Sequence, residues 1–407
     1  MATFFLLIIY LAFISLGIPD SLLGVAWPVM QPEIGAPFES AGLLSMVIAG
    51  GTIVSSLLSG SVIRKLGTGK LTLVSCLMTA GALLGFSLAP SLLWLIALAI
   101  PLGLGGGAVD AGLNHYVAAH YKAHHMSWLH CFWGVGATLG PIIMSAHIAG
   151  DQSWRSGYMT VALIQFGLVV LLFVTLPLWK RVAALHHSAG EQVPAESGSD
   201  GEQGRREPAN DGRHPLRMKG AKVTMLAFLF YCGAESTVGL WGASFLVGAR
   251  HLSAETAATW ISLYYGGITL GRFIAGFVTL TVSNRALILI GQLFALAGGL
   301  IVLFPLPGAL TLTGFMLIGL GLAPIYPCLL HETPARFGKD QSAKLMGYQM
   351  AVAYTGTTVL PPLFGVIASG TSVAWFPAVV ILFILSMLFG SESVNRAMKA
   401  RQAGIGA

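Results

Sequence analysis

The sequence predicts an all-α membrane protein whose twelve transmembrane helices form two six-helix, pseudo-symmetric halves. Composition is the first reason: 55% of the 407 residues are hydrophobic and only 9% are charged, against roughly 25% charged residues in a soluble domain. The second reason is a series of long apolar stretches, and the third is a single polar segment that divides them into two groups. The mean hydropathy of +0.77 excludes a water-soluble globule.

Twelve stretches reach the length of about 18 apolar residues that a helix needs to cross a bilayer. The first lacks the basic start and the small-residue cleavage site of a signal peptide, so it is predicted to be a spanning helix. In order, the stretches cover approximately residues 3–30, 38–63, 70–90, 92–119, 127–149, 155–179, 222–248, 255–280, 285–304, 308–330, 343–369 and 373–391.

The polar segment 182–220 is predicted to be a flexible cytoplasmic linker. It is rich in Gly, Pro, Ser and charged residues and has no apolar periodicity. Such a segment cannot bury enough apolar surface to offset the entropy lost on ordering. It separates an N-terminal half, residues 1–181, from a C-terminal half, residues 221–407.

The positions of the basic residues predict the orientation. All but three of the 22 Lys and Arg residues fall on one side of the predicted helices; Arg155 and Arg250 fall on the other side, and Arg272 lies within a span. By the positive-inside rule the basic side is cytoplasmic. We therefore expect a multi-pass protein of the cell inner membrane with both termini in the cytoplasm. The net charge of +6 is then a topology signal and does not indicate nucleic-acid binding.

Glycines recur in the two halves at a constant offset, the one that separates Gly17 from Gly233. Because glycine lets helices approach closely, shared positions indicate shared packing, as expected for two like-oriented six-helix units. Gly60 and Gly276 are candidate structural or gating positions within this series. The matched pairs are Gly17 and Gly233, Gly50 and Gly266, Gly51 and Gly267, Gly60 and Gly276, Gly103 and Gly319, Gly105 and Gly321, and Gly140 and Gly356.

Six local patterns accompany the repeat in chain order: GIPDSLLGVAWP, GLGGGAVDAGLNH, LHCFWGVGATLGP, YCGAESTVGLW, YYGGITLGRFIAG and GLGLAPIYP. With them the whole chain resembles the major facilitator superfamily, and within it the fucose permease and sodium-dependent glucose transporter-like branch. The resemblance implies the major facilitator fold. It also implies secondary active transport of a solute by alternating access to the two sides of the membrane.

The chain departs from the family pattern in two places. The loop after the second helix usually reads GxLaDRxGRR in the superfamily, but here it reads GSVIRKLGTGK, with Arg64 in place of the Asp. The acid of the fourth helix is typically Glu in fucose permease-like proteins and is Asp110 here. The first departure puts the charge relay of that loop in doubt, and the second leaves the substrate open.

Three carboxylates interrupt the apolar stretches: Asp20, Asp110 and Glu235. An ionisable side chain at membrane depth costs several kcal/mol, roughly, and is a functional hypothesis by default. Burial disfavours the charged form of an acid, so these groups can take up a proton near neutral pH and are candidates for proton coupling. Asp110 is the first candidate, because the offset of the glycine repeat places Tyr326 opposite it, whereas Asp20 and Glu235 occupy related positions.

Several polar or aromatic side chains are candidates for binding the solute. Asn114 lies one helical turn from Asp110 and so shares its face, and Trp27 and Trp241 follow Asp20 and Glu235 in their helices, where an indole can pack on a sugar ring. An alternative for Asp20 is a hydrogen bond to backbone at a kink near Pro19. The remaining candidates are Gln349, Tyr265 and His130.

Arg272 is the one basic residue predicted at membrane depth, and two roles are open for it. It can pair with an acid across the bundle, or it can extend its charged end to the cytoplasmic interface. Two roles are also possible for His130: it can relay protons, or it can be a residue at the end of a helix that bonds to a neighbour. Trp128, Trp133 and Trp260 are interpreted as packing or interfacial residues.

Neither a metal site nor a cofactor site is predicted, and the chain is not expected to be an enzyme. The four cysteines lack CxxC spacing, and the cluster of His120, His124 and His125 has no acidic or cysteine partner. No protease-like signature accompanies Ser127 and His130. A channel or receptor would not require the repeat of two halves.

The sequence therefore predicts a monomeric secondary active transporter in a lipid bilayer. Its partners are expected to be a sugar-like small-molecule solute and a coupling ion, H⁺ rather than Na⁺, moved together as symport. The alternatives are a proton-driven exporter of drugs or metabolites and an uncoupled facilitator.

Overall fold

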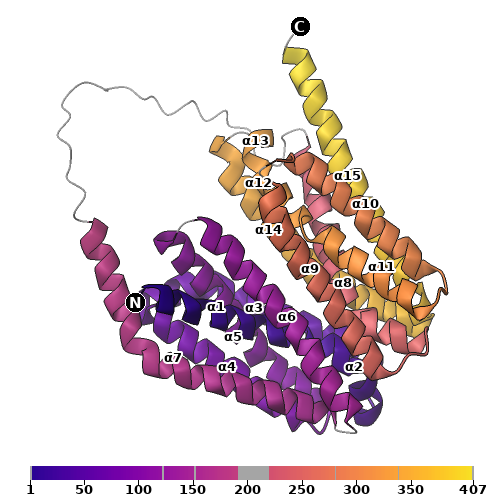
Figure 1. Cartoon of the computed structure of the whole chain (residues 1–407), viewed down its shortest axis with the longest axis horizontal. Helices are drawn as coiled ribbons and strands as arrows, with labels where there is room; N and C mark the ends of the chain where they lie inside the picture. Colours follow the sequence, from indigo (N-terminus) through magenta and orange to yellow (C-terminus); the bar gives the residue numbers. More distant parts are fainter. Residues whose placement is uncertain are drawn as a thin grey trace.

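A computed structural model describes residues 2–121, 123–150, 153–190, 220–279, 281–337 and 339–405. Within these ranges every regular element is helical, and twelve helical segments are long and apolar enough to cross a membrane. Each predicted span overlaps one of them, which confirms the predicted all-α membrane fold. The segments form two bundles that lie side by side (Figure 1).

The N-terminal bundle contains the first six spans. It comprises α1 (Ala2–Asp20), α2 (Leu22–Ile34), α3 (Ser40–Leu66), α4 (Thr68–Ser87), α5 (Leu92–His120), α6 (Ala123–Ala149) and α7 (Trp154–Gly190). Helix α7 continues past the predicted end of its span as far as Gly190. The rest of the predicted linker, residues 191–219, lies outside the described residues.

The C-terminal bundle contains the other six spans. It comprises α8 (Ala221–Gly248), α9 (Ala254–Val278), α10 (Asn284–Leu303), α11 (Gly308–Leu322), α12 (Ile325–His331), α13 (Thr333–Phe337), α14 (Lys339–Gly370), the 3₁₀ turn η2 (Val373–Trp375) and α15 (Phe376–Ile405).

Two spans are interrupted. The first changes from α1 to α2 at Ser21, directly after Asp20, and the hydroxyl of Ser21 donates to the carbonyl of Ile18 at 3.1 Å. The tenth changes from α11 to α12 at Ala323 and Pro324. Because an interruption exposes polar backbone, it is tolerated at membrane depth where it is buried in protein or lines a cavity.

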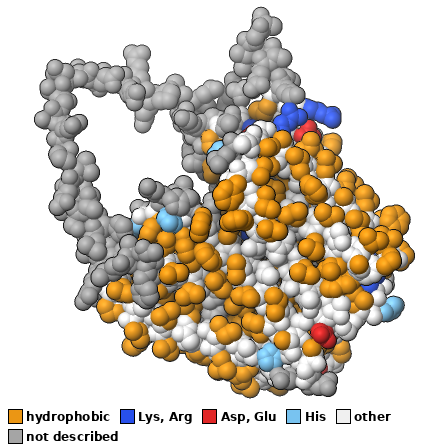
Figure 2. All heavy atoms as spheres, viewed as in Figure 1, with side chains coloured by type: hydrophobic (Ala, Val, Ile, Leu, Met, Phe, Trp, Pro, Cys, Tyr) orange, Lys and Arg blue, Asp and Glu red, His pale blue; other side chains and the backbone are white. Residues whose placement is uncertain are grey.

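The flank of the molecule is apolar, as a membrane protein requires. Large hydrophobic side chains are exposed along it, among them Leu57, Leu93 and Phe389, each more than two-thirds exposed. Figure 2 shows hydrophobic atoms over most of the visible flank and Lys and Arg atoms mainly at one end. A surface of this kind is stable only against lipid or another apolar solvent.

The glycine repeat marks equivalent helix contacts in the two halves. A Cβ atom on Gly103 of α5 would collide with the carbonyl oxygen of Ile48 in α3, and one on Gly319 of α11 would collide with the carbonyl oxygen of Tyr264 in α9. Both members of the first contact are related to those of the second by the same offset in the sequence. The repeat therefore reflects close backbone packing at these positions.

Gly60 and Gly276, like Gly50, lack the close contacts that Gly103 and Gly319 make. Both are exposed; a Cβ on Gly60 would meet only the end of the Arg64 side chain at 4.0 Å, and one on Gly276 would meet no described atom within 4 Å. In this conformation neither residue is in a close helix contact.

We expect Gly319→Ala to destabilise the protein and Gly276→Ala to leave it unchanged. The added methyl group at Gly319 meets backbone that cannot move aside, which costs about 1–3 kcal/mol, whereas the one at Gly276 enters open space. Thermal unfolding of the detergent-solubilised variants measures the difference. Equal melting temperatures for the two variants would contradict the close packing of α9 on α11.

The two halves meet at one end. Helix α6 packs on α9, α3 on α14, and α2 on α8. At this end the hydroxyls of Ser145 and Thr259 are 2.8 Å apart, and the rings of Phe38 and Trp241 stack with centroids 4.7 Å apart. Figure 1 shows the bundles diverging toward the opposite end, which holds the start of α1 and the helices α12 and α13.

At that diverging end a polar network joins helices of the C-terminal half to one another. Arg336 donates to Glu332 at 3.2 Å and to Asn395 at 3.0 Å. Asn395 in turn donates to Glu392 at 2.7 Å, and Glu392 pairs with Arg285 at 3.3 Å. The network connects α10, α13 and α15, which favours movement of this half as one body.

Candidate functional site

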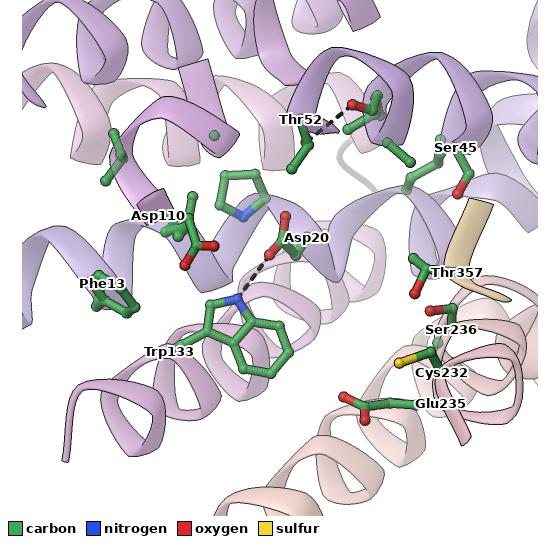
Figure 3. A pocket seen from close by; sticks show the side chains of 18 of the residues that line it. Phe13, Asp20, Ser45, Thr52, Asp110, Trp133, Cys232, Glu235, Ser236 and Thr357 are labelled. Carbon is green, nitrogen blue, oxygen red and sulfur yellow. Dashed lines mark hydrogen bonds between the residues drawn. The ribbon is translucent and has the colours of Figure 1, made fainter. Parts of the chain in front are cut away.

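A cavity of about 450 Å³ lies between the two halves. Its wall includes residues of α1 to α7 on one side and of α8, α9, α12 and α14 on the other. Figure 3 shows Asp20, Asp110 and Trp133 on the N-terminal wall, with Glu235, Ser236, Cys232 and Thr357 across from them. All three predicted acids therefore face one cavity, although they come from three different helices.

Asp20 accepts a hydrogen bond from Trp133, which was predicted to be a packing or interfacial residue. The indole nitrogen of Trp133 donates to Oδ2 of Asp20 at 2.8 Å (Figure 3). Asp20 lies at the end of α1 and is exposed to the cavity. The alternative for Asp20 was a hydrogen bond to backbone at a kink near Pro19. The structure shows instead a hydrogen bond with a side chain of α6.

Asp110 is bonded within its own helix. The amide of Asn114 donates to Oδ1 of Asp110 at 2.9 Å, as their spacing of four residues allows. Asp110 lines the cavity, while Asn114 lies behind it, outside the wall. In this conformation Asn114 orients the acid and does not itself face the cavity.

Glu235 is paired with a cation. The guanidinium of Arg272 lies 3.3 Å from Oε1 of Glu235, and both side chains are less than one-fifth exposed. The hydroxyl of Tyr231 donates to Oε2 of Glu235. Of the two roles open for Arg272, the structure shows the pairing with an acid, within the C-terminal wall of the cavity.

Trp133 connects the acids of the two halves. Its indole N–H binds Asp20, while the guanidinium of Arg272 lies 5.3 Å from the centre of its ring, within the range of a cation–π interaction. A continuous polar array thus runs from Asp20 through Trp133 and Arg272 to Glu235. Within this array only the contact between Trp133 and Arg272 joins the two halves, so it is the contact that relative movement of the halves would change.

Two further predicted residues lie in the wall. Tyr265 of α9 is buried and faces the cavity, and His130 of α6 is exposed to it. His130 is therefore placed within the cavity and not only at a helix end. The ring of Phe13 meets the imidazole edge-on, with centroids 6.1 Å apart.

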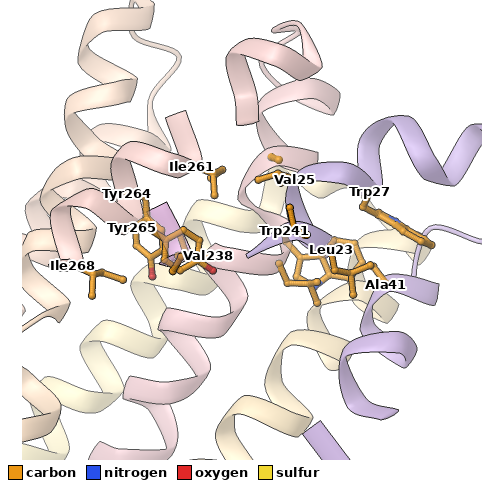
Figure 4. Packing of buried hydrophobic residues seen from close by; sticks show 14 of the residues in the cluster. Leu23, Val25, Trp27, Ala41, Val238, Trp241, Ile261, Tyr264, Tyr265 and Ile268 are labelled. Atoms are coloured by element: carbon orange, nitrogen blue, oxygen red, sulfur yellow. The ribbon is translucent and has the colours of Figure 1, made fainter. Parts of the chain in front are cut away.

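Trp27 and Trp241 are not in the cavity wall. Both side chains are fully buried, and their indole nitrogens donate to the carbonyls of Phe38 at 3.0 Å and Pro361 at 2.8 Å. Figure 4 shows them packed with Leu23, Val25 and Ala41. In this conformation they seal the end where the halves meet, because each ring lies about two helical turns beyond the acid that precedes it.

Gln349 also lies outside the wall. Its side chain is fully buried and its Oε1 accepts from the hydroxyl of Thr333 at 3.0 Å. The bond holds α14 against the start of α13 near the diverging end. A polar side chain in an apolar span was the only signal for Gln349, and here its Oε1 is bonded inside the C-terminal half while its Nε2 has no hydrogen-bond partner among the described residues.

Three cavity residues were missed as site candidates: Trp133, Tyr231 and Gln165. Tyr231 precedes Glu235 by four residues, and Trp133 follows His130 by three, so helical spacing from a predicted site residue was an available signal. Gln165 of α7 accepts from the hydroxyl of Ser15 at 2.9 Å. It is a polar side chain within a span, the pattern that singled out Gln349.

The charges of the wall are unequally distributed. Arg272 neutralises Glu235 in the C-terminal half, whereas neither Asp20 nor Asp110 forms an ion pair with any described residue. The N-terminal wall therefore holds two carboxyl groups that can exchange a proton or bind a cation. Hydroxyls of Thr52, Ser236 and Thr357 add neutral hydrogen-bonding groups.

Comparison with known proteins gives a family and several relatives. A model of the Major Facilitator Superfamily matches residues 9–329. Membrane protein MosC of Rhizobium meliloti is 23% identical over 384 residues, 90% of this chain and 84% of that protein. The glucose/mannose transporter GlcP of Bacillus subtilis is 24% identical over 331 residues, 79% of this chain and 77% of that protein.

A solved structure has the same fold. It is a bacterial homologue of the human lysosomal transporter Spinster in an inward-facing, unoccupied conformation, with a TM-score of 0.69 at 12% identity. The match covers 98% of this chain and 97% of that one.

Proposed function

This chain belongs to the major facilitator superfamily of transporters, and we propose that it moves a sugar-like polar solute through the membrane together with a proton. The observation that carries the proposal is the pair of carboxyl groups, Asp20 and Asp110, that face the cavity without a cationic partner among the described residues. A carboxyl group in such a place can bind and release a proton as its access changes.

The roles within the site follow from the contacts. Asp110 is the proton-coupling group, oriented by Asn114, because the one hydrogen bond that it forms with the described residues comes from its own helix and is kept when the halves move. Tyr265 and His130, with the hydroxyl groups of the wall, bind the solute. The similarity to a protein named as a glucose/mannose transporter supports a sugar-like solute.

Transport would occur by rocking of residues 1–181 against residues 221–407 about the cavity. The halves are closed at the end that holds Ser145 and Thr259, and the positive-inside rule assigns this end to the outside. The conformation is then open to the cytoplasm, with both termini on the cytoplasmic side.

We expect acidification of the outside to stimulate solute uptake into proteoliposomes, and Asp110→Asn to abolish this stimulation. The amide keeps the shape and the hydrogen bond of Asp110 but cannot carry a proton. Uptake of D-glucose, D-mannose and D-glucosamine, measured with and without a pH gradient, tests the expectation. A sodium gradient at constant pH is the control.

Each alternative gives a different result in the same vesicles. Flux that responds to neither proton nor sodium gradients would identify an uncoupled facilitator. Proton influx that drives solute out would identify an exporter. No movement of any of the three sugars would contradict the proposed function.

A further inference from the structure

We propose that the transported solute carries a positively charged amino group beside its hydroxyl groups, and that Asp20 binds this amino group. The inference deepens the proposed function and rests on it. It would make the substrate an aminated sugar or polyol, not a neutral one. The charge of the wall, the contacts of Asp20 and the aromatic side chains around it carry the argument.

The first step is the charge that the wall offers to a solute. The acidic residues of the wall are Asp20, Asp110 and Glu235, and its basic residues are Arg272 and His130. Arg272 is committed to Glu235 at 3.3 Å. If Asp110 carries the coupling proton, Asp20 remains as an acid with no cation beside it among the described residues.

The contact of Asp20 suits the ionised form. An indole nitrogen can only donate a hydrogen bond, so the 2.8 Å bond from Trp133 stabilises a carboxylate at Asp20. It occupies Oδ2 only; within the described part of the chain Oδ1 has no hydrogen-bond partner. A charge that is held in place with one free oxygen is suited to receive an ammonium group.

Aromatic rings beside Asp20 complete a cation site. Trp133 already has a guanidinium 5.3 Å from its ring centre, which shows that the electrostatics of this ring accommodate positive charge. Tyr265 contributes a further ring to the same wall. The hydroxyls of Ser236 and Thr357 are then available to the hydroxyl groups of the solute, and the hydroxyl of Thr52, which donates to backbone carbonyls, can accept from them.

A neutral sugar would fit the cavity less well. It would take water from the Asp20 carboxylate without supplying a counter-charge, and a desolvated charge without a partner is unfavourable. An anionic sugar would add repulsion from Asp20. Of these three kinds of solute, only a cationic one offsets the charge of the Asp20 carboxylate. The volume of about 450 Å³ is sufficient for a hexose with bound water.

The experiment uses matched pairs of sugars that differ only in an amino or hydroxyl group at carbon 2: D-glucosamine with D-glucose, D-mannosamine with D-mannose, and D-galactosamine with D-galactose. Proton-driven uptake of each is measured in proteoliposomes that contain the full chain. We expect at least one amino sugar to exceed its hydroxyl partner by about tenfold, the usual difference for a hydrogen bond to a charged group. N-acetyl-D-glucosamine, which has the added nitrogen without the charge, should resemble D-glucose.

Variants assign the preference to a residue. Asp20→Asn should reduce the preference for the amino sugar to less than about twofold, whereas Asp20→Glu, which keeps the charge, should retain a preference. Glu39→Gln is the matched control, because Glu39 lies at the closed end, outside the cavity wall. Like Asp20→Asn, it removes one negative charge from the protein, but it should leave the preference for the amino sugar unchanged.

The outcomes separate this inference from the proposed function. Proton-driven uptake of the neutral sugars at rates equal to or above those of the amino sugars would overturn the inference and leave the proposed function standing. An amino-sugar preference that survives Asp20→Asn would overturn the assignment to Asp20. Absence of uptake of all six sugars would overturn both, and the comparison within the wild-type protein does not depend on the folding of any variant.

Discussion

Replacement of Arg272 by glutamine is expected to abolish transport and to lower the melting temperature. The guanidinium pairs with Glu235 and lies over the ring of Trp133. Its removal leaves the Glu235 carboxylate, less than one-fifth exposed, without a counter-charge. Loss of one partner of a buried pair costs about 3 kcal/mol or more, and here it also removes a contact between the two halves.

A second substitution distinguishes the charge from the contact. Arg272→Gln combined with Glu235→Gln removes both charges and should restore most of the thermal stability, but not transport, because the cation over Trp133 is still missing. Arg272→Lys keeps the charge without the planar group, and it should retain part of the thermal stability and part of the transport activity.

The control for Arg272 is Arg64→Gln. Arg64 is exposed and donates a hydrogen bond to Ser61 in its own helix. Its loss should therefore change neither the melting temperature nor the transport activity. Stability is measured by thermal unfolding in detergent, and transport by uptake into proteoliposomes. Full activity of the Arg272→Gln variant would contradict any role of this array in transport.

The second large effect is expected from a cross-link between the halves. The hydroxyls of Ser145 in α6 and Thr259 in α9 are 2.8 Å apart at the closed end, close enough for cysteines at these positions to form a disulfide after small adjustments. Oxidation of the double variant Ser145→Cys with Thr259→Cys should hold this end closed. Because alternating access requires the end to open, uptake should fall to a few per cent, roughly, of the reduced rate.

Reversibility makes the cross-linking result specific. A thiol reductant should restore uptake in the double variant, and each single-cysteine variant should respond to neither oxidant nor reductant. The native cysteines provide a necessary control, since Cys76 and Cys232 line the cavity; the wild-type protein is oxidised in parallel. Unchanged uptake by a fully cross-linked sample would exclude the opening of α6 from α9 as part of the cycle.

The transmembrane helices and the repeat could be predicted from sequence because each depends on local composition. A bilayer requires about 20 apolar residues per span, and this requirement appears directly in the chain. Gly103 and Gly319 recur because backbone approaches backbone in both halves. Gly60 and Gly276 share the same offset without such a contact, which shows that recurrence alone does not locate a packing site.

The candidate site could be predicted only in part. Asp20, Asp110 and Glu235 were recognisable because an acid in an apolar span is costly wherever it points. Trp27, Trp241 and Gln349 were predicted from proximity to an acid or from polarity, and the structure places them in packed regions. Trp27 and Trp241 lie about two helical turns beyond the acids, which places them in the contact between the halves and not in the cavity wall.

The sequence by itself determined that this protein spans a membrane with twelve helices, and that three acids lie within them. Both properties follow from the free energy of placing each side chain in lipid, which is a property of single residues and their close neighbours. Only the tertiary structure decided that Trp133 binds Asp20 while Arg272 neutralises Glu235. Those contacts join different helices, α1 with α6 and α8 with α9, and their existence depends on how the helices pack against each other.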